Sequence, residues 1–225
     1  GYAALMRICQ DDGLRLLLPL EAMWLLSCPL VGPPEVAKQF VSALGQCGEQ
    51  WDACVISGLH PRAPLTVALI ESVQPNFRIA MGTKSVRNTA SLRGGLEGFY
   101  ARRSHGTRRS LQKARRRAQR YQVEYESIHL EPSASLATDC KDLYERILSV
   151  EARSWKGIRQ VGITHGDMNA FYRQMLPRLI RARALRLLFA RIDDLDVGYI
   201  LGGIWHTTYR GLQFSFDDAY RSLSV

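Results

Sequence analysis

Cysteine is scarce in this 225-residue chain and follows no ligand pattern. Its five cysteines are widely separated, with no Cys-x-x-Cys pair and no histidine at metal-ligand spacing; they are Cys9, Cys28, Cys47, Cys54 and Cys140. Such spacing argues against the common zinc modules and against a disulfide framework. We therefore expect no metal site, and reduced, mostly buried thiols of the kind found in cytoplasmic proteins.

Long apolar runs are also absent. The nearest candidate, residues 14–30, is interrupted by Arg15, Pro19, Glu21 and Pro29. It therefore falls short of the roughly 18 apolar residues that cross a bilayer. The first seven residues lack the features of a secretory signal peptide. Because the chain does not begin with Met, we expect it to be a fragment of a longer protein.

Several well-known functional signatures are missing. The chain contains no Gly-x-Ser-x-Gly, no phosphate loop ending in Gly-Lys-Ser/Thr and no His-Glu-x-x-His. These absences argue against an α/β-hydrolase, a P-loop nucleotidase and a zinc protease of the corresponding types. Signatures of helix-turn-helix, zinc-finger and RNA-recognition modules are missing as well. The sequence therefore favours none of these enzyme or nucleic-acid-reading classes.

Acidic residues are missing from one long segment. No Asp or Glu lies between Glu97 and Glu124, while nine Lys and Arg side chains concentrate much of the net charge of +9 on residues 102–120. A cluster of this kind predicts an anionic ligand. Two interpretations stay open: a solvated helix face near an anionic substrate or cofactor, or a surface that binds a polyanion. Aromatic residues only flank the segment, which argues against base stacking.

The first part of the chain alternates strand and helix signals. Asp11-Asp12-Gly13 separates two apolar runs and predicts a β-hairpin. Pro33-Pro34 opens a helix with one apolar face. The predicted elements are strands 3–10 and 14–22, a helix from 33 to about 45–48, strand 51–59, helix 64–73 and strand 77–84. The polar, glycine-containing segment 83–98 then separates a first lobe, residues 1–90, from a second, residues 91–225.

The second lobe has the order β-α-α-β-β-β after a cationic helix. That helix begins near Arg109 and carries a narrow apolar stripe. The elements that follow are strand 121–130, a long helix ending near residue 155, helix 167–184, and strands 185–192, 197–205 and 211–217. The last three strands, joined by short turns, predict an antiparallel meander.

Four motifs in this order carry a family resemblance. They are the arginine-rich run 108–117, Ser154-Trp155-Lys156-Gly157 at a helix end, the pair Phe171-Tyr172, and Asp217-Asp218-Ala219-Tyr220 after the last strand. With them the chain resembles GNAT-type acyltransferases, specifically a bacterial branch similar to cellulose-biosynthesis acetyltransferase-like proteins. The resemblance covers most of the chain and is strongest over residues 96–225.

The resemblance implies an α/β (α+β) protein of two GNAT-like lobes, each a mixed, mostly antiparallel sheet flanked by helices. The first lobe would be a degenerate relative of the second, as in the similar Fem-type aminoacyltransferases. Further elements would precede Tyr2, and a loop, a helix and two strands would follow Val225. The start of the first lobe and the C-terminal part of the second are therefore expected to lie outside this chain.

The resemblance also implies acetyl-CoA or another acyl-CoA as donor, held along the last strand and the loop after it. The implied cofactor-binding residues are Phe214, Ser215, Phe216, Arg221, Ser222, Ser224 and Val225. An amide-lined loop before a helix is a suitable site for the CoA pyrophosphate.

Acyl transfer needs a base for the acceptor and a proton donor for the leaving thiolate. Asp217 or Asp218 is the candidate base, and Tyr220 or Tyr209 the candidate acid. The alternative is that these aspartates cap a turn and these tyrosines pack at the sheet edge.

Candidate substrate-binding residues are Trp155, Lys156 and His206. Each has a simpler alternative: packing for the indole, a solvated helix end for the lysine, and an exposed turn for the histidine.

The implied function is transfer of an acyl group from CoA to an amine or hydroxyl acceptor. The acceptor would be a small molecule or a saccharide in cellulose, exopolysaccharide or envelope biosynthesis, handled in the bacterial cytoplasm. Two alternatives stay open. One is a Fem-like transferase that uses aminoacyl-tRNA bound through residues 102–120, and the other is a non-catalytic GNAT-like module that binds a polyanion or a partner protein.

Overall fold

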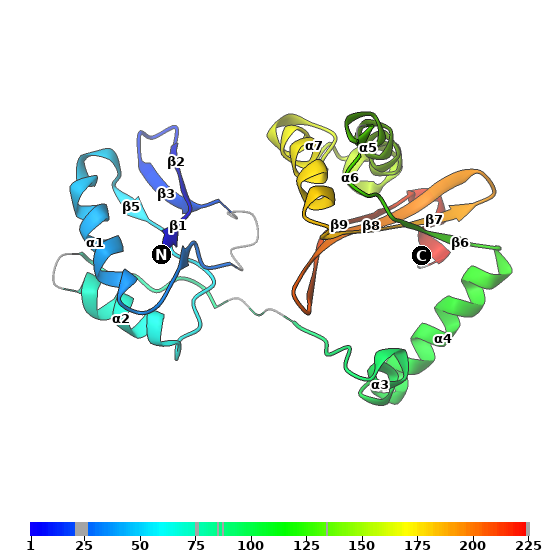
Figure 1. Ribbon diagram of the computed structural model, residues 1–225, viewed down its shortest axis with the longest axis horizontal. Helices are drawn as coiled ribbons and strands as arrows, with labels where there is room; N and C mark the ends of the chain where they lie inside the picture. Colours follow the sequence, from blue (N-terminus) through cyan, green and yellow to red (C-terminus); the bar gives the residue numbers. More distant parts are fainter. Residues whose placement is uncertain (21–26, 75–76, 85, 87, 134, 224–225) are drawn as a thin grey trace. The chain divides into compact units, whose positions relative to one another are not determined.

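The structure is a computed structural model that describes residues 1–20, 27–74, 77–84, 86, 88–133 and 135–223. Contacts within the chain divide it into two compact units, Gly1–Ser91 and Leu92–Val225, each with its own apolar core (Figure 1). In the described part of the chain, no helix is long and apolar enough to cross a membrane.

The first unit contains two small sheets and two helices. Strand β2 (Leu5–Cys9) pairs with β3 (Arg15–Pro19) in the predicted hairpin, and β3 pairs in parallel with β5 (Ala53–Cys54). The remaining elements are β1 (Tyr2–Ala3), β4 (Leu30–Val31), α1 (Val36–Gln46), the short 3-10 helix η1 (Gly48–Gln50) and α2 (Pro64–Val73). Apolar faces of α1 and α2 supply most of its core.

Two strand predictions in this unit are wrong. The strand expected over 51–59 shortens to Ala53–Cys54, and Gly58 soon turns the chain with a φ of +64°. The segment 77–84 forms no strand, although Phe77, Ile79 and Met81 alternate as a strand would require. Phe77 packs on Trp51 with ring centroids 5.6 Å apart, whereas residues 78–84 are exposed. Alternation predicts a strand only where a neighbouring strand is available to pair with it.

The second unit follows the predicted β-α-α-β-β-β order. Two helices precede it, α3 (Gly95–Ala101) and the cationic α4 (His105–Arg120). The order itself consists of β6 (Glu124–Ile128), α5 (Leu136–Arg153) with the single turn α6 (Trp155–Ile158), α7 (Gly166–Arg181), β7 (Leu185–Ile192), β8 (Leu195–Trp205) and β9 (Thr208–Phe216). A short 3-10 helix, η2 (Asp218–Leu223), follows.

The four strands form one antiparallel sheet in the order β6-β7-β8-β9. The predicted α/β (α+β) fold, a mostly antiparallel sheet flanked by helices, is confirmed for this unit. Helices α5, α6 and α7 cover one face of the sheet (Figure 1). Ile147, Val150 and Ile180 from the helices meet Phe189 and Leu201 from the strands in the core. Burial of these side chains, worth roughly 1.5–3 kcal/mol each, holds the helices on the sheet.

The cysteines are free, as predicted, but the expectation that most are buried is wrong. Only Cys140, on the inner face of α5, is buried, while Cys9 and Cys47 are exposed. Burial raises the pKa of the half-buried Cys54 thiol to about 11, so this cysteine stays protonated at neutral pH.

The turn between α5 and α6 depends on Gly157. A Cβ at this position would overlap the backbone carbonyl of Glu151 and crowd that of Ala152. We predict that Gly157→Ala lowers the free energy of unfolding by about 1–3 kcal/mol, because rigid backbone must move to admit the methyl group. The matched control is Gly106→Ala in α4, where a Cβ would meet only Ser104 Oγ, at 4.0 Å. It should be neutral or slightly stabilising. Urea unfolding followed by circular dichroism measures both, and equal effects would contradict the assignment.

Candidate active site

Strand β9 lies at one edge of the sheet, and its pairing with β8 is interrupted by a bulge. Leu201 pairs with Gln213, but the next residue of β8, Gly202, pairs with Gly211, which leaves Leu212 without a cross-strand partner. Among the described residues no further strand covers the outer edge of β9. Bulges bend a strand and redirect its groups, and they are frequent beside active sites.

Two side chains from the helices end on backbone carbonyls of β9. The Tyr172 hydroxyl, from α7, donates to the carbonyl oxygen of the bulged Leu212 at 3.2 Å. The Lys156 ammonium, from α6, donates to the carbonyl oxygen of Phe214 at 2.6 Å. These bonds fix the bulged part of the edge strand against the helices and supply donors to two of its backbone carbonyls.

Lys156 lies in a small polar cluster rather than in solvent. Its Nζ also donates to Gln213 Oε1 at 3.1 Å and lies 3.7 Å from Glu151 Oε1, and its side chain is only 19% exposed. Burial lowers the pKa of Lys156, and attraction to the Glu151 carboxylate works against that shift. The simpler sequence interpretation, a solvated lysine at a helix end, does not describe this environment.

Glu151 is a fully buried carboxylate on the core face of α5. Its Oε2 accepts a 2.9 Å hydrogen bond from the Tyr199 hydroxyl of β8, and its Oε1 accepts one from the backbone N–H of Ile163 at 3.3 Å. Burial, together with the adjacent carboxylate, raises the pKa of Tyr199, so its hydroxyl remains a donor. Gly162 leaves room for the carboxylate, because an added Cβ would lie 2.5 Å from Oε1.

The cluster therefore pairs the Lys156 ammonium with the Glu151 carboxylate at a sheet edge, with the Tyr172 and Tyr199 hydroxyls nearby. A half-buried ammonium is worth more to a developing negative charge than one in water, because the local dielectric constant is lower. Burial raises the pKa of Tyr172 as well, which keeps its proton in place at neutral pH. This chemistry suits a reaction in which an oxygen or sulfur atom becomes negative beside β9.

The predicted base Asp217 is buried at the end of β9, and both its oxygens are occupied. Oδ2 accepts from Arg153 Nε at 2.6 Å, and Oδ1 accepts from the backbone N–H of Ala219 at 3.0 Å. Arg153 also donates to the carbonyl oxygen of Asp196, so the pair joins α5 to the ends of β8 and β9. A carboxylate in this setting is suited to holding the strand end and the η2 turn.

Of the other predicted acid–base residues, two lie close to Asp217 in the sequence and one lies at the opposite end of β9. Asp218 and Tyr220 are half-buried in η2, directly after Asp217. Tyr209 lies near the start of β9, against Gly202, where burial raises its pKa. Asp218 and Tyr220 therefore lie just past the C-terminal end of β9, close to Asp217, whereas Tyr209 lies at its N-terminal end, next to the β8–β9 turn.

The predicted cofactor residues divide into a strand group and an η2 group. Phe214 is half-exposed with its ring 5.7 Å from that of Phe216, whereas Ser215 is buried opposite Tyr199. Arg221 and Ser222 are exposed in η2, and the Ser222 carbonyl accepts a hydrogen bond from Arg117. Ser224 and Val225 lie outside the described residues.

The three predicted substrate-binding residues do not lie together. Trp155 is next to Lys156, 47% exposed, with the Arg159 guanidinium 5.9 Å from its ring centroid. His206 lies in the turn between β8 and β9, beside Trp205, with a φ of +52°. The strand from Thr208 to Phe214 separates that turn from Lys156 by roughly 20 Å. His206 is thus remote from the lysine cluster.

Glu151, Tyr199 and Gln213 were missed by sequence reasoning, and Tyr172 was noted only as part of an aromatic pair. A signal for Glu151 exists, because it lies four residues after the buried Ile147 and so shares its helix face. A carboxylate on an apolar stripe requires a buried partner. Tyr199 and Gln213 offer no comparable signal, since aromatic and polar residues are ordinary in a half-covered sheet.

Comparison with known proteins gives one finding. The family model described as acetyltransferase (GNAT) domain matches residues 105–225, which is more than half of the chain and includes the whole β9 site. No curated protein and no solved structure matches the chain. Within the described ranges, no group of three or more His, Cys, Asp or Glu side chains is arranged to hold a metal ion.

The buried carboxylate gives a direct test of the cluster. We predict that Tyr199→Phe lowers the free energy of unfolding by about 1–3 kcal/mol, because Glu151 Oε2 loses its hydroxyl donor while remaining buried. The control is Tyr125→Phe on β6, whose side chain is 55% exposed and should change stability by less than about 0.5 kcal/mol. Chemical unfolding of the two variants decides the matter, and a neutral Tyr199→Phe would contradict the described bond.

Proposed function

The chain belongs to the acetyltransferase (GNAT) domain family, and from this premise we propose that its second unit transfers an acyl group from acyl-CoA to an amine or hydroxyl acceptor at the edge of β9. The observation that carries the proposal is the position of Lys156. Its partly desolvated ammonium contacts the backbone of β9, the edge strand along which the family resemblance implies that the donor lies.

The residues at this edge are suited to an acyl-CoA. In the described residues the outer edge of β9 is unpaired by another strand, so its backbone groups can pair with the amides of a pantetheine chain. The Phe214 carbonyl has a second lone pair beside the bond from Lys156. The Phe214 and Phe216 rings offer apolar cover, and the exposed Arg221 offers a cation for a phosphate. The bound thioester supplies an activated acyl group.

Lys156 and Tyr172 have separate roles in this proposal. The Lys156 ammonium holds positive charge where negative charge develops during acyl transfer, and Glu151 keeps that ammonium in place from the buried side. The Tyr172 hydroxyl fixes the Leu212 carbonyl and thereby the shape of the bulge. Asp218 and Tyr220, half-buried and without the ion pair that occupies Asp217, are the candidates for moving the acceptor's proton.

The acceptor in this proposal is a saccharide or a small molecule with an amine or hydroxyl. Trp155 supports a sugar, because a half-exposed indole next to Lys156 offers an apolar plane for the C–H face of a sugar ring. The motif resemblance supports a role in bacterial cellulose or exopolysaccharide assembly, and the cytoplasm as the site of the reaction.

Release of free CoA tests the function. With acetyl-CoA and either glucosamine or cellobiose as acceptor, we predict acceptor-dependent thiol release, measured with a thiol-reactive chromophore. Lys156→Met should lower kcat/KM by about 100-fold or more, the usual cost of removing one stabilising donor. The control Lys141→Met removes an exposed lysine from α5 and should leave the rate unchanged.

Calorimetry with acetyl-CoA separates a poor acceptor from a missing activity. Micromolar binding without turnover points to a different acceptor. The proposal is overturned if acetyl-CoA neither binds nor reacts, or if a folded Lys156→Met variant is as active as the parent chain.

The pH profile gives a second prediction for Lys156. Because its pKa lies below the usual 10.5, activity that needs the ammonium is present below that lowered pKa and falls as pH rises through it. Lys156→Arg should retain activity to higher pH, because arginine stays charged there. Initial rates between pH 7 and 10.5 measure both profiles. If activity falls over the same alkaline pH range in the parent chain and in Lys156→Arg, the loss of activity is due to another titrating group.

A further inference from the structure

Helix α4 has two opposite faces with different surroundings. Ala118 is buried, Leu111 and Ala114 are half-buried, and the Arg117 guanidinium contacts the backbone of Ser222 in η2. These residues anchor the helix on the second unit. Residues 105, 108, 109, 112, 113 and 116 recur at helical spacing on the other face, and all six are exposed. The anchoring leaves this second face open to solvent.

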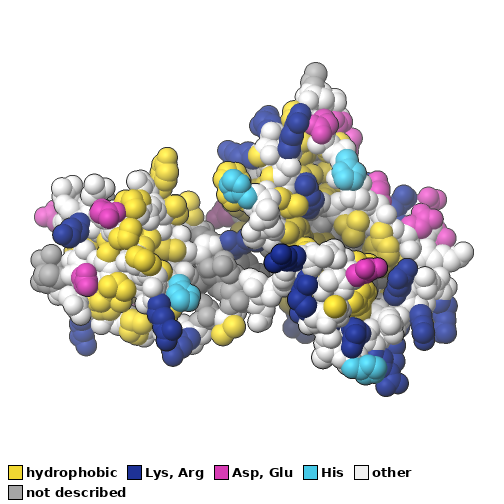
Figure 2. Space-filling view, turned by 60° about the horizontal axis from the view of Figure 1, so that its bottom comes forward, with side chains coloured by type: hydrophobic (Ala, Val, Ile, Leu, Met, Phe, Trp, Pro, Cys, Tyr) yellow, Lys and Arg dark blue, Asp and Glu magenta, His cyan; other side chains and the backbone are white. Residues whose placement is uncertain are grey.

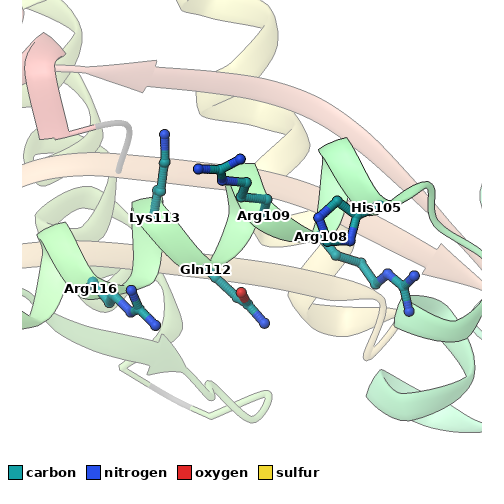
Figure 3. A pocket seen from close by; sticks show the side chains of 6 residues that line it. All are labelled: His105, Arg108, Arg109, Gln112, Lys113 and Arg116. Atoms are coloured by element: carbon teal, nitrogen blue, oxygen red, sulfur yellow. The ribbon is translucent and has the colours of Figure 1, made fainter.

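The open face forms a shallow groove along the helix axis. Its lining residues are His105, Arg108, Arg109, Gln112, Lys113 and Arg116. Figure 3 shows Arg109 and Lys113 on one side of α4, and Arg108, Gln112 and Arg116 on the other. Basic side chains gather over this part of the second unit in the space-filling view (Figure 2). Two rows of side chains that run along the helix axis fit a long ligand better than a compact one.

The cations of this face have no acidic partners within the described residues. None of Arg108, Arg109, Lys113 and Arg116 takes part in an ion pair, in contrast to Arg146 and Arg153 of the same unit. Glu97 is the last acid before them and Glu124 the first after them. Their positive potential is therefore uncompensated and available to an external anion.

The residue types on the face point to phosphate carried on a polymer. Three of the four cations are arginines, whose planar forks match phosphate oxygens in pairs. No Phe, Tyr or Trp lies between residues 102 and 120, so the face offers no platform for stacking single-stranded bases. It also carries no large apolar side chain that could enter a lipid bilayer. A double-helical backbone, with its dense phosphates and hidden bases, satisfies these conditions best.

We propose that the exposed face of α4 binds the phosphate backbone of double-helical nucleic acid without reading its sequence. The lining residues extend over about 16 Å of helix, at 1.5 Å per residue. A duplex presents roughly one phosphate charge per 1.7 Å of its axis, which is ample for four cations. The site is separate from the β9 cluster, so the proposal does not depend on acyl transfer.

Salt dependence of duplex binding is the measurement. Fluorescence anisotropy with a mixed-sequence 20-base-pair duplex, as DNA and as RNA, should give a log–log slope of about −3.6 for four phosphate contacts. Affinity should then fall about 100-fold between 50 and 200 mM salt. Two duplexes of different sequence should bind equally. Sequence-selective binding, or a slope near zero, would overturn the proposal.

The decisive variant is Arg108→Gln, Arg109→Gln, Lys113→Gln and Arg116→Gln combined. It should bring the slope from about −3.6 to near zero, and glutamine keeps the helix favourable. The matched control removes four exposed cations from the first unit: Arg7→Gln, Lys38→Gln, Arg62→Gln and Arg78→Gln. Both proteins have the same net charge. Equal weakening in the two would show a non-specific charge effect and overturn the assignment to α4.

Two further measurements, a charge-conserving variant and a vesicle comparison, test the proposal if the quadruple variant unfolds. Arg108→Lys, Arg109→Lys and Arg116→Lys combined should keep the salt slope, because the contacts are between charges. Vesicles of phosphatidylserine and phosphatidylcholine provide the membrane comparison. If the parent chain binds vesicles more tightly than duplex at equal salt, and vesicles displace the duplex, the partner is a membrane and the proposal fails.

Discussion

The second unit depends on one buried charge. Glu151 has no access to solvent, and a carboxylate in that position is costly unless charge and hydrogen bonds compensate it. The compensation comes from Lys156 after the α5–α6 turn, from Tyr199 in β8 and from the Ile163 backbone. Each partner belongs to a different segment. The carboxylate therefore fixes the relative positions of the helix, the turn and the sheet.

That constraint extends to the edge strand. Lys156 lies beside Glu151 and also donates to Gln213 and to the Phe214 carbonyl of β9. Tyr172 holds the bulged Leu212 two residues away. Arg153, two residues after Glu151 in α5, pairs with Asp217 directly after β9 and closes the same junction. The edge that the proposed donor would use is thus shaped by ionic and hydrogen-bonded contacts from α5, α6 and α7.

The sequence predicted the architecture of the second unit because apolar periodicity there agrees with pairing partners along the chain. It also singled out Lys156 as a candidate, through the Ser-Trp-Lys motif, but not its contacts with Glu151 and β9. It failed for residues 77–84, where alternation is present but no strand is available to pair. It also missed Glu151, because the buried face of α5 was identified from its apolar residues alone and Glu151 is a charged residue on that face. Asp217 was assigned as a base from its position alone, and only the three-dimensional contact with Arg153 shows how its oxygens are used.

The proposed function requires acyl-CoA to bind at the edge of β9. Hydrogen–deuterium exchange of the whole chain, with and without saturating acetyl-CoA, tests this most directly. We predict slower amide exchange in Thr208–Phe216 and Asp218–Leu223, with α1 and α2 unchanged. Exchange that is unaffected in β9 and η2 while other segments become protected would contradict it.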